Sequence, residues 1–308
     1  MHKYIIRRLL MLIPVIIGVT FIVYSIMFFT PGDPALIILG ENAPEEQVEK
    51  LREEMGLNDP FIIQYLRFLK NALKGDFGRS YSTRKPVFNE VFSRFPATLK
   101  LSTAGLLLAV AIGIPIGIIS ATRQYSLLDS ITMVLALLGV SMPNFWLGLM
   151  LILLFSVRLG LLPSGGDVGF ASLILPAITL GTGVAAIITR MTRSSMLEVI
   201  RQDYIRTARA KGVAERRVIN KHALKNALIP VVTVIGLQFG YLLGGAVLTE
   251  TVFSWPGVGR LMVEAIKQKD TPVVLASVIF MSVVFSIVNL LVDILYAFLD
   301  PRIKSQYR

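Results

Sequence analysis

The strongest constraint on this chain is a series of long stretches that carry almost no charged residues. The first, residues 9–29, would measure roughly 31 Å as a helix, which is the thickness of the hydrocarbon core of a bilayer. Five further apolar runs follow, at residues 98–121, 131–157, 172–189, 226–249 and 271–299. The sequence therefore predicts an all-α membrane protein with six transmembrane helices.

The composition excludes several classes of soluble protein and of reactive site. Hydrophobic residues make up 54% of the chain and charged residues 17%, whereas soluble domains average about 45–50% and about 25%. The chain contains no Cys, and His2 and His222 are its two histidines. Disulfides, thiol nucleophiles and thiolate or multi-histidine metal sites are therefore excluded, and we expect no metal site.

A secretory signal peptide is the alternative interpretation of the first apolar run, because Lys3, Arg7 and Arg8 precede it. That run is longer than the 7–15 residues typical of a signal peptide, and no small-x-small cleavage site follows it. We therefore expect a retained transmembrane helix.

The distribution of charge predicts the orientation in the membrane. If the N-terminus is cytoplasmic and six spans alternate, the inner segments hold 17 Lys and Arg residues and five acidic residues. The outer segments hold 14 of each, and Asp293 lies within the last span. The excess of positive charge is then entirely cytoplasmic, as the positive-inside rule requires. This predicts a multi-pass protein of the inner or plasma membrane with both termini in the cytoplasm. The same distribution accounts for the high pI, so binding to nucleic acid is not needed to explain it.

Small residues recur at helical spacing in two of the spans. Gly236, Gly240 and Gly244 form a doubled small-xxx-small pattern, and Gly113 and Gly117 form another. Such spacing lets helix backbones approach closely, within one chain or between the copies of a homodimer. In a chain with six spans we favour packing within the chain.

Polar and amphipathic residues at membrane depth indicate a candidate translocation path. Residues 141–146 (SMPNFW) interrupt the third span with a proline, which predicts a kink. Polar side chains within spans usually face a bundle interior or a water-filled route. The candidate path residues are Met142, Asn144, Trp146 and Gln238.

A long segment between the first two spans, residues 31–96, is predicted to be external and to contain two amphipathic helices. Pro44 precedes one of these helices and Pro60 the other. The segment could form a lid, a docking surface or a cap on the bilayer interface, and the residues do not distinguish these roles.

An inner segment that begins at Asp203 is short, basic and rich in helix-forming residues. Ala208 and Gly212 lie one turn apart, with Arg206, Arg209 and Lys211 beside them. Gly212 is also a candidate for a helix end with positive φ. A face of small residues suits insertion into a cleft of another protein. An ordinary basic loop attracted to anionic headgroups is the alternative.

At these residues the chain resembles a known family. Residues 204–212 (YIRTARAKG) and 222–230 (HALKNALIP) resemble the cytoplasmic EAA loop of binding-protein-dependent ABC importer permeases. More specifically, the chain is similar to the first permease of the dipeptide, oligopeptide, glutathione and nickel importers. Further matching motifs run along the whole chain, at residues 4–8, 31–34, 75–78, 141–144, 192–196, 255–257 and 299–302. One departure is that the Glu-Ala-Ala positions read Arg206, Thr207 and Ala208.

The resemblance implies a type I ABC importer permease fold with an external loop subdomain between helices 1 and 2. The implied domains are a first helix (1–30), the external subdomain (31–96), a transmembrane domain (97–300) with a coupling loop at 198–226, and a cytoplasmic tail (301–308). The implied partners are a second homologous permease, two cytoplasmic ABC ATPases and an external substrate-binding protein. ATP and Mg²⁺ would bind the ATPases, and no cofactor is expected here. The residues expected to couple to an ATPase are Asp203, Tyr204, Arg206, Thr207, Ala208, Arg209, Lys211 and Gly212.

The expected function is permeation of di- or oligopeptides, with no catalytic residues in this chain. Nickel chelates, glutathione or oligosaccharides are alternative substrates for the same architecture. No Lys follows a Gly, so the chain lacks the phosphate-binding loop of an ATPase. A self-sufficient secondary transporter and an intramembrane hydrolase are the alternatives from other classes. The first would be expected to show repeats or intramembrane charges, and the second a catalytic cluster within the spans.

Overall fold

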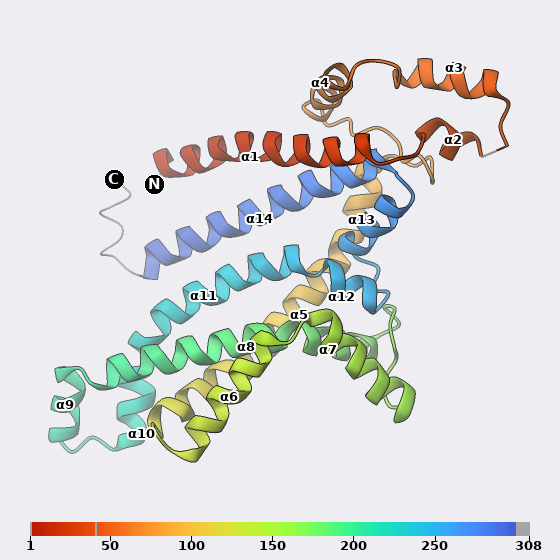
Figure 1. The fold of residues 1–308 in the computed structure, drawn as a ribbon. Helices are drawn as coiled ribbons and strands as arrows, with labels where there is room; N and C mark the ends of the chain where they lie inside the picture. The colour runs from red at the N-terminus through yellow and green to blue at the C-terminus, as the bar shows by residue number, and fades with distance from the viewer. Residues whose placement is uncertain (1, 41, 300–308) are drawn as a thin grey trace. The chain divides into compact units, whose positions relative to one another are not determined.

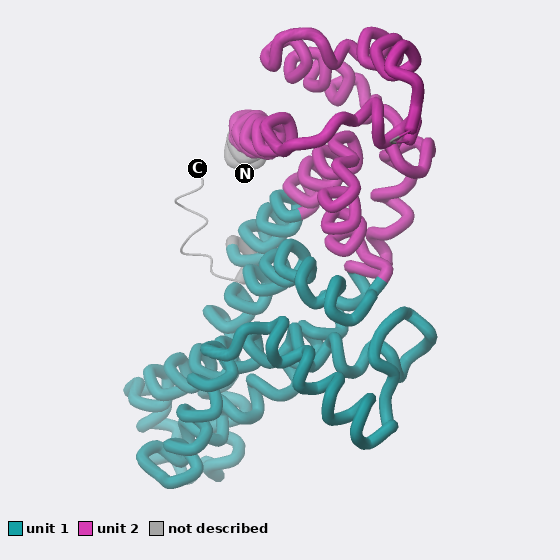
Figure 2. The backbone as a smooth tube through the Cα atoms, turned by 45° about the vertical axis from the view of Figure 1, so that its right-hand side comes forward, with its two compact units in different colours: residues 1, 99–255, 285–308 teal, residues 2–98, 256–284 magenta. Residues whose placement is uncertain are grey.

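The structure is a computed structural model that describes residues 2–40 and 42–299, and most of them are helical (Figure 1). An isolated bridge between Arg79 and Pro86 is the only β interaction in that part of the chain. The described residues divide into two compact units, coloured separately in Figure 2. Unit 1 holds residues 99–255 and 285–299, and unit 2 holds residues 2–98 and 256–284. The predicted tail, 301–308, lies outside the described residues.

Unit 2 contains the first span, the external segment and a later pair of helices. Its helices are α1 (His2–Phe29), α2 (Pro34–Leu39), α3 (Glu45–Met55), α4 (Phe61–Ala72) and α13 (Val258–Lys267). The beginnings of α5 (Val87–Thr122) and α14 (Thr271–Leu299) belong to it as well. The two helices predicted after Pro44 and Pro60 are confirmed as α3 and α4.

Unit 1 contains the rest of α5 and α14 and all elements between Leu99 and Trp255. These elements are α6 (Leu127–Ser141), α7 (Asn144–Leu151), the π-helix η1 (Ile152–Arg158), α8 (Phe170–Ile200), α9 (Asp203–Ala210), α10 (Glu215–Arg217), the π-helix η2 (Val218–Ala223), α11 (Leu224–Gly245) and α12 (Val247–Val252). Within the unit, α8 packs against α6, α7, α11 and α12.

Five of the six predicted spans are continuous helices that are long and apolar enough to cross a membrane. The third is not, because α6 and the helix formed by α7 and η1 meet at an angle of 102°. Pro143 lacks an N–H group and disfavours helical geometry at the residue before it, and Met142 is accordingly extended (φ −75°, ψ 126°). The predicted kink is therefore a complete break.

Two predicted spans extend beyond their apolar runs. Helix α5 begins at Val87 rather than near residue 98, and α8 continues to Ile200 rather than ending near residue 189. The extra turns bury apolar residues outside the uncharged run. Val87 and Val91 join the core of unit 2, and Met196 is fully buried in unit 1.

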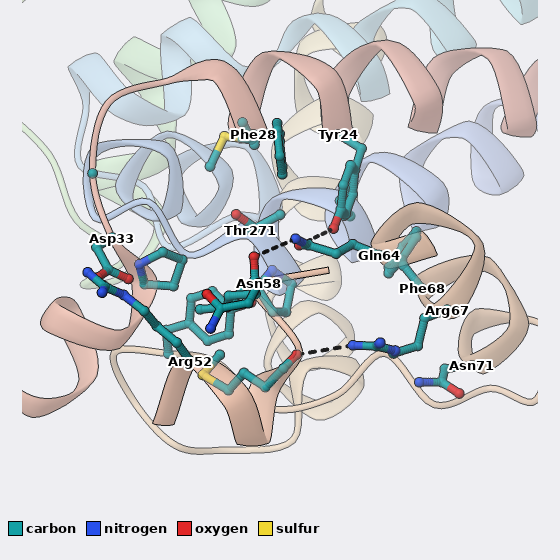
Figure 3. Close-up of a pocket in the computed structure, with 18 of the residues that line it drawn as sticks. Tyr24, Phe28, Asp33, Arg52, Asn58, Gln64, Arg67, Phe68, Asn71 and Thr271 are labelled. Atoms are coloured by element: carbon teal, nitrogen blue, oxygen red, sulfur yellow. Dashed lines mark hydrogen bonds and ion pairs between the residues drawn. The ribbon is translucent and has the colours of Figure 1, made fainter. Parts of the chain in front are cut away.

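Polar contacts hold α4 on the outer half of α1 in unit 2. The Tyr65 hydroxyl lies 2.9 Å from the Ile17 carbonyl oxygen and 3.1 Å from the Thr20 hydroxyl. The Tyr24 hydroxyl donates to Gln64 at 3.2 Å beside a hollow of about 380 Å³ (Figure 3). The opposite side of α4 leaves Ile62, Ile63 and Leu66 about half exposed. The face of α4 that points away from α1 is therefore apolar, which suits either a docking surface or a cap on the bilayer interface.

Close helix approach in unit 1 depends on glycines. A Cβ atom on Gly117 of α5 would lie 2.6 Å from the Thr192 Cβ and 2.7 Å from the Thr189 oxygen, both on α8. A Cβ atom on Gly236 of α11 would lie 2.6 Å from Val292 of α14. Nothing lies within 4 Å of the same position on Gly244. The predicted packing within the chain is therefore confirmed for Gly117 and Gly236, but Gly244 has no such neighbour.

Two matched alanine variants test this packing. Gly117→Ala should destabilise the chain by about 1–3 kcal/mol, because α5 and α8 must separate to admit the methyl group. Gly244→Ala should be neutral or stabilising by up to about 1 kcal/mol, because alanine is the better helix former and the space is open. The measurement is the unfolding midpoint of each purified variant in detergent. Equal midpoints would contradict the close contact.

Candidate functional site

The inner segment after α8 folds as the predicted short helix, α9. Asp203 lies in its first turn and Arg209 in its last turn, and both charges suit the helix dipole. Gly212 then adopts φ +73°, a left-handed conformation that glycine allows without cost. The N–H groups of Gly212 and Val213 donate to the Arg209 and Ala208 carbonyls at 2.9 and 3.3 Å, which is the Schellman pattern. The predicted helix end with positive φ at Gly212 is confirmed.

Helix α9 is held against the spans by an apolar cluster, which we call the inner cluster. Its buried members are Ala121, Met196, Ile205, Val218, Ile219, Ala223 and Ala227, from α5, α8, α9, η2 and α11. Ile205 is the α9 member and is fully buried. The cluster fixes which face of α9 is available to a partner.

Ala208 lies on the inner side of α9. It is half-buried and packs against the inner cluster, because it follows Ile205 by three positions on the helix. Gly212 is exposed, with open space around it. Ala208 keeps part of its surface exposed, so the expectation that Ala208 and Gly212 contribute to a docking face stays a prediction. The exposed positions of the helix are Asp203, Tyr204, Arg206, Thr207, Arg209 and Ala210.

The charges of the candidate coupling residues are mostly solvent-facing. Arg209 donates two hydrogen bonds to Glu215, at 3.0 and 2.7 Å, and these bonds raise the pKa of Arg209 above its ordinary value. Arg206 lies 3.6 Å from Asp203, and both side chains are largely exposed. The Tyr204 hydroxyl accepts a 2.8 Å hydrogen bond from Asn226. Lys211 is exposed after the helix end.

The four candidate path residues lie on two elements. Met142 and Asn144 are half-buried at the break between α6 and α7, and Trp146 is 45% exposed in the first turn of α7. Gln238 is half-buried in the middle of α11. No hydrogen bond joins any two of the four within the described residues. Their assignment to a path stays a prediction.

A polar site that sequence reasoning missed joins three helices of unit 1. Asp129 at the start of α6 is buried and accepts two hydrogen bonds from Arg193 of α8, each 2.7 Å long. Asp129 also accepts hydrogen bonds from the Ser120 hydroxyl of α5 and from the Tyr125 N–H group. The carboxylate is therefore saturated with donors. No sequence spacing reveals this pair, because 64 residues separate its members.

Breaking this ion pair should cost more than replacing both partners. Asp129→Asn should destabilise the chain by about 3–5 kcal/mol, because it leaves the partly buried Arg193 charge without a counter-ion. The double variant Asp129→Leu, Arg193→Met should recover most of that loss. Asp203→Asn, which breaks an exposed pair, should change stability by less than about 1 kcal/mol. Denaturation of the purified variants measures all three, and equal effects of Asp129→Asn and Asp203→Asn would contradict the assignment.

The WPG motif at residues 255–257 begins with a side chain that has a structural role. Trp255 is fully buried, and the Lys100 ammonium lies 5.2 Å from the centre of its ring. Lys100 also forms a 2.6 Å ion pair with Asp167. Lys100 of α5 therefore contacts both Trp255 of the motif and Asp167.

Comparison with known proteins identifies the family. Residues 113–305 match the family described as binding-protein-dependent transport system inner membrane component, and residues 1–102 match the N-terminal part of such components. This chain belongs to that family. The resemblance inferred from the sequence is confirmed, as are the all-helical importer fold and the role of a permease.

Relatives of this family cover the whole chain. The dipeptide transport system permease protein DppB of Alkalihalophilus pseudofirmus is 48% identical, over 99% of this chain and 100% of its own. The glutathione transport system permease protein GsiC of Escherichia coli K12 is 45% identical, over 99% of both chains.

Solved structures support the same fold. Inward-facing structures of the MetNI methionine ABC transporter match with TM-scores of 0.56 and 0.57 at 20% identity. They cover 70% of this chain and 99% of the matched chain. The family description also places the chain in the inner membrane, in agreement with its apolar helices.

Proposed function

We propose that this chain forms half of the translocation path of an ABC importer for di- or oligopeptides. In this proposal an external binding protein delivers the peptide, a second homologous permease completes the path, and two cytoplasmic ATPases drive transport. The observation that carries the proposal is the full-length identity of 48% to a dipeptide permease. Glutathione is the second candidate substrate, because a glutathione permease is 45% identical over the same length.

The exposed side of α9 is the proposed contact with an ATPase. The inner cluster and the Schellman turn at Gly212 hold the helix in a fixed orientation. Its exposed residues, among them Arg206 and Thr207, are then presented to the cytoplasm if the orientation predicted from charge holds. The chain itself needs no nucleotide or metal in this scheme.

The test of the function is reconstitution. The tagged chain should co-purify with two ATPases and a second permease. In vesicles, the complex should import a radiolabelled dipeptide only when the external binding protein and ATP are both present. Faster import of glutathione than of dipeptides would select the second substrate. Uptake by this chain alone, without an ATPase, would instead identify a self-sufficient transporter.

Two threonines give a matched test of the docking face. Thr207 in α9 and Thr122 at the end of α5 are both exposed, and each hydroxyl donates to a carbonyl four residues earlier. Thr207→Trp should reduce co-purification of the ATPases, because added bulk at a packed interface forces displacement. Thr122→Trp should leave it unchanged. Equal recovery of ATPases with both variants would contradict docking through α9.

Gly212→Ala separates backbone geometry from bulk in the same assay. Nothing lies within 4 Å of an added Cβ atom, but φ is +73°, and a non-glycine residue there costs about 1 kcal/mol. Docking should therefore weaken moderately, and the loss should be smaller than with Thr207→Trp.

Single cysteines test the proposed orientation with both termini in the cytoplasm. The chain has no native cysteine, and Ser164 and Ala214 are both exposed. In sealed cells an impermeant thiol reagent should label Ser164→Cys and leave Ala214→Cys unlabelled. Lysis should expose both cysteines to the reagent. The reverse pattern in sealed cells would invert the topology.

A further inference from the structure

A cavity of about 480 Å³ lies in unit 1 among α6, α8 and α11. Its lining combines apolar side chains with two arginines and a serine. The residues are Met133, Ile187, Arg190, Met191, Arg193, Ser194 and Val234.

The cavity follows an incompletely covered face of α8. In the most apolar stretch of α8, 61% is buried, compared with 33% or less in the corresponding stretches of the other continuous spans. Ile187, Arg190, Met191 and Ser194 nevertheless remain half-buried or exposed. They recur at positions i, i+3, i+4 and i+7, and so form one stripe along the helix. The stripe is one part of α8 that the other described helices do not cover fully.

Every polar group that lines the cavity can donate a hydrogen bond, and two of these groups carry positive charge. Arg190 makes no ion pair or side-chain hydrogen bond with any described residue. Arg193 uses Nε and Nη2 for Asp129, which leaves Nη1 free. Ser194 adds a hydroxyl, and no acidic residue lines the cavity. Because the Asp129 carboxylate offsets the charge of Arg193, the net charge that faces the cavity is that of Arg190. This chemistry selects an anion.

We propose that this cavity is a subsite for the carboxylate of the transported substrate, with Arg190 as its main binding residue. The inference rests on the proposed function. Dipeptides carry a free C-terminal carboxylate and glutathione carries two, so either candidate substrate offers the required group. Arginine matches the planar geometry of a carboxylate with paired donors.

The surroundings favour a substrate over a lipid phosphate. Arg193 is fixed to a buried carboxylate and is not free to extend toward the headgroups. Met133 and Met191 form flexible, polarizable walls, which suit substrates whose side chains vary. Val234 of the cavity and the candidate path residue Gln238 lie one turn apart on α11. The cavity and the predicted path therefore share a helix face.

The first test measures the anion preference of the cavity without any substrate. Ser194→Cys would be the only cysteine of the chain and retains Arg190. In the assembled complex, a sulfonate-bearing thiol reagent should modify it at least about threefold faster than a trimethylammonium-bearing reagent, because a unit charge lies nearby. Adding Arg190→Gln should abolish this preference. Equal rates in the presence of Arg190 would overturn the proposal whatever the complex transports.

The second test measures transport. Wild-type uptake of a labelled dipeptide or of glutathione reports on the proposed function alone. Given such uptake, Arg190→Gln should lower it about tenfold or more, the factor expected for a lost hydrogen bond to a charged group. Arg190→Lys should retain much of it, and ATPase co-purification should stay normal in both variants. The control is Arg123→Gln, which removes an exposed arginine between α5 and α6 and should transport normally.

Vesicle composition distinguishes a substrate carboxylate from a lipid phosphate as the anion that binds in the cavity. The defect of Arg190→Gln should be the same in vesicles of phosphatidylcholine alone and in vesicles that also contain phosphatidylglycerol. A defect confined to vesicles with the anionic lipid would assign the cavity to a lipid phosphate and overturn the proposal. Normal uptake by Arg190→Gln in both kinds of vesicle would overturn it as well.

Discussion

The close approach of α5 to α8 is the contact on which the rest of unit 1 depends. Lipid tails are as apolar as leucine, so helices in a bilayer associate through close packing rather than by leaving water. Gly113 and Gly117 supply that packing, because a Cβ atom on either would lie within 3 Å of α8. With α5 in place on one side, α8 can be contacted by α6, α7 and α11 on others. The face that remains open carries Arg190.

The inner end of α8 carries this rigidity to the proposed ATPase contact. Arg193 is locked to Asp129 of α6, and Met196, one turn later, is buried in the inner cluster beside Ile205 of α9. The same cluster includes Ala121 near the end of α5. A displacement of α9 would therefore press directly on the ends of α5 and α8, without a flexible linker between. Such contiguous contact is what a coupling element requires.

The sequence predicted features that depend on local chemistry and missed those that depend on tertiary contacts. Apolar length predicted the spans, Pro143 predicted an interruption, and Gly212 predicted a helix end with positive φ. The half-burial of Ala208 was not predictable, because a small residue suits either side of a helix and the inner cluster decides which side is covered. The Asp129–Arg193 pair has no sequence signature, since each residue stands beside the end of an apolar run, where charges are common. The extension of α8 to Ile200 depends on the same cluster, which only the folded chain assembles.

The break at Pro143 bears on where substrate could pass. Irregular backbone is tolerated at membrane depth only where protein buries it or where it lines a water-filled cavity, because hydrocarbon offers no hydrogen bonds. Met142 is extended, and Ser141 and Pro143 on either side of it are exposed in this chain. The backbone at the break must therefore be covered by water or by another protein chain in the membrane. In the proposed importer of two permeases, the interface between the subunits would meet this requirement. The exposed backbone at the break is thus a reason to expect the route there that does not depend on the polar side chains of Asn144 and Gln238.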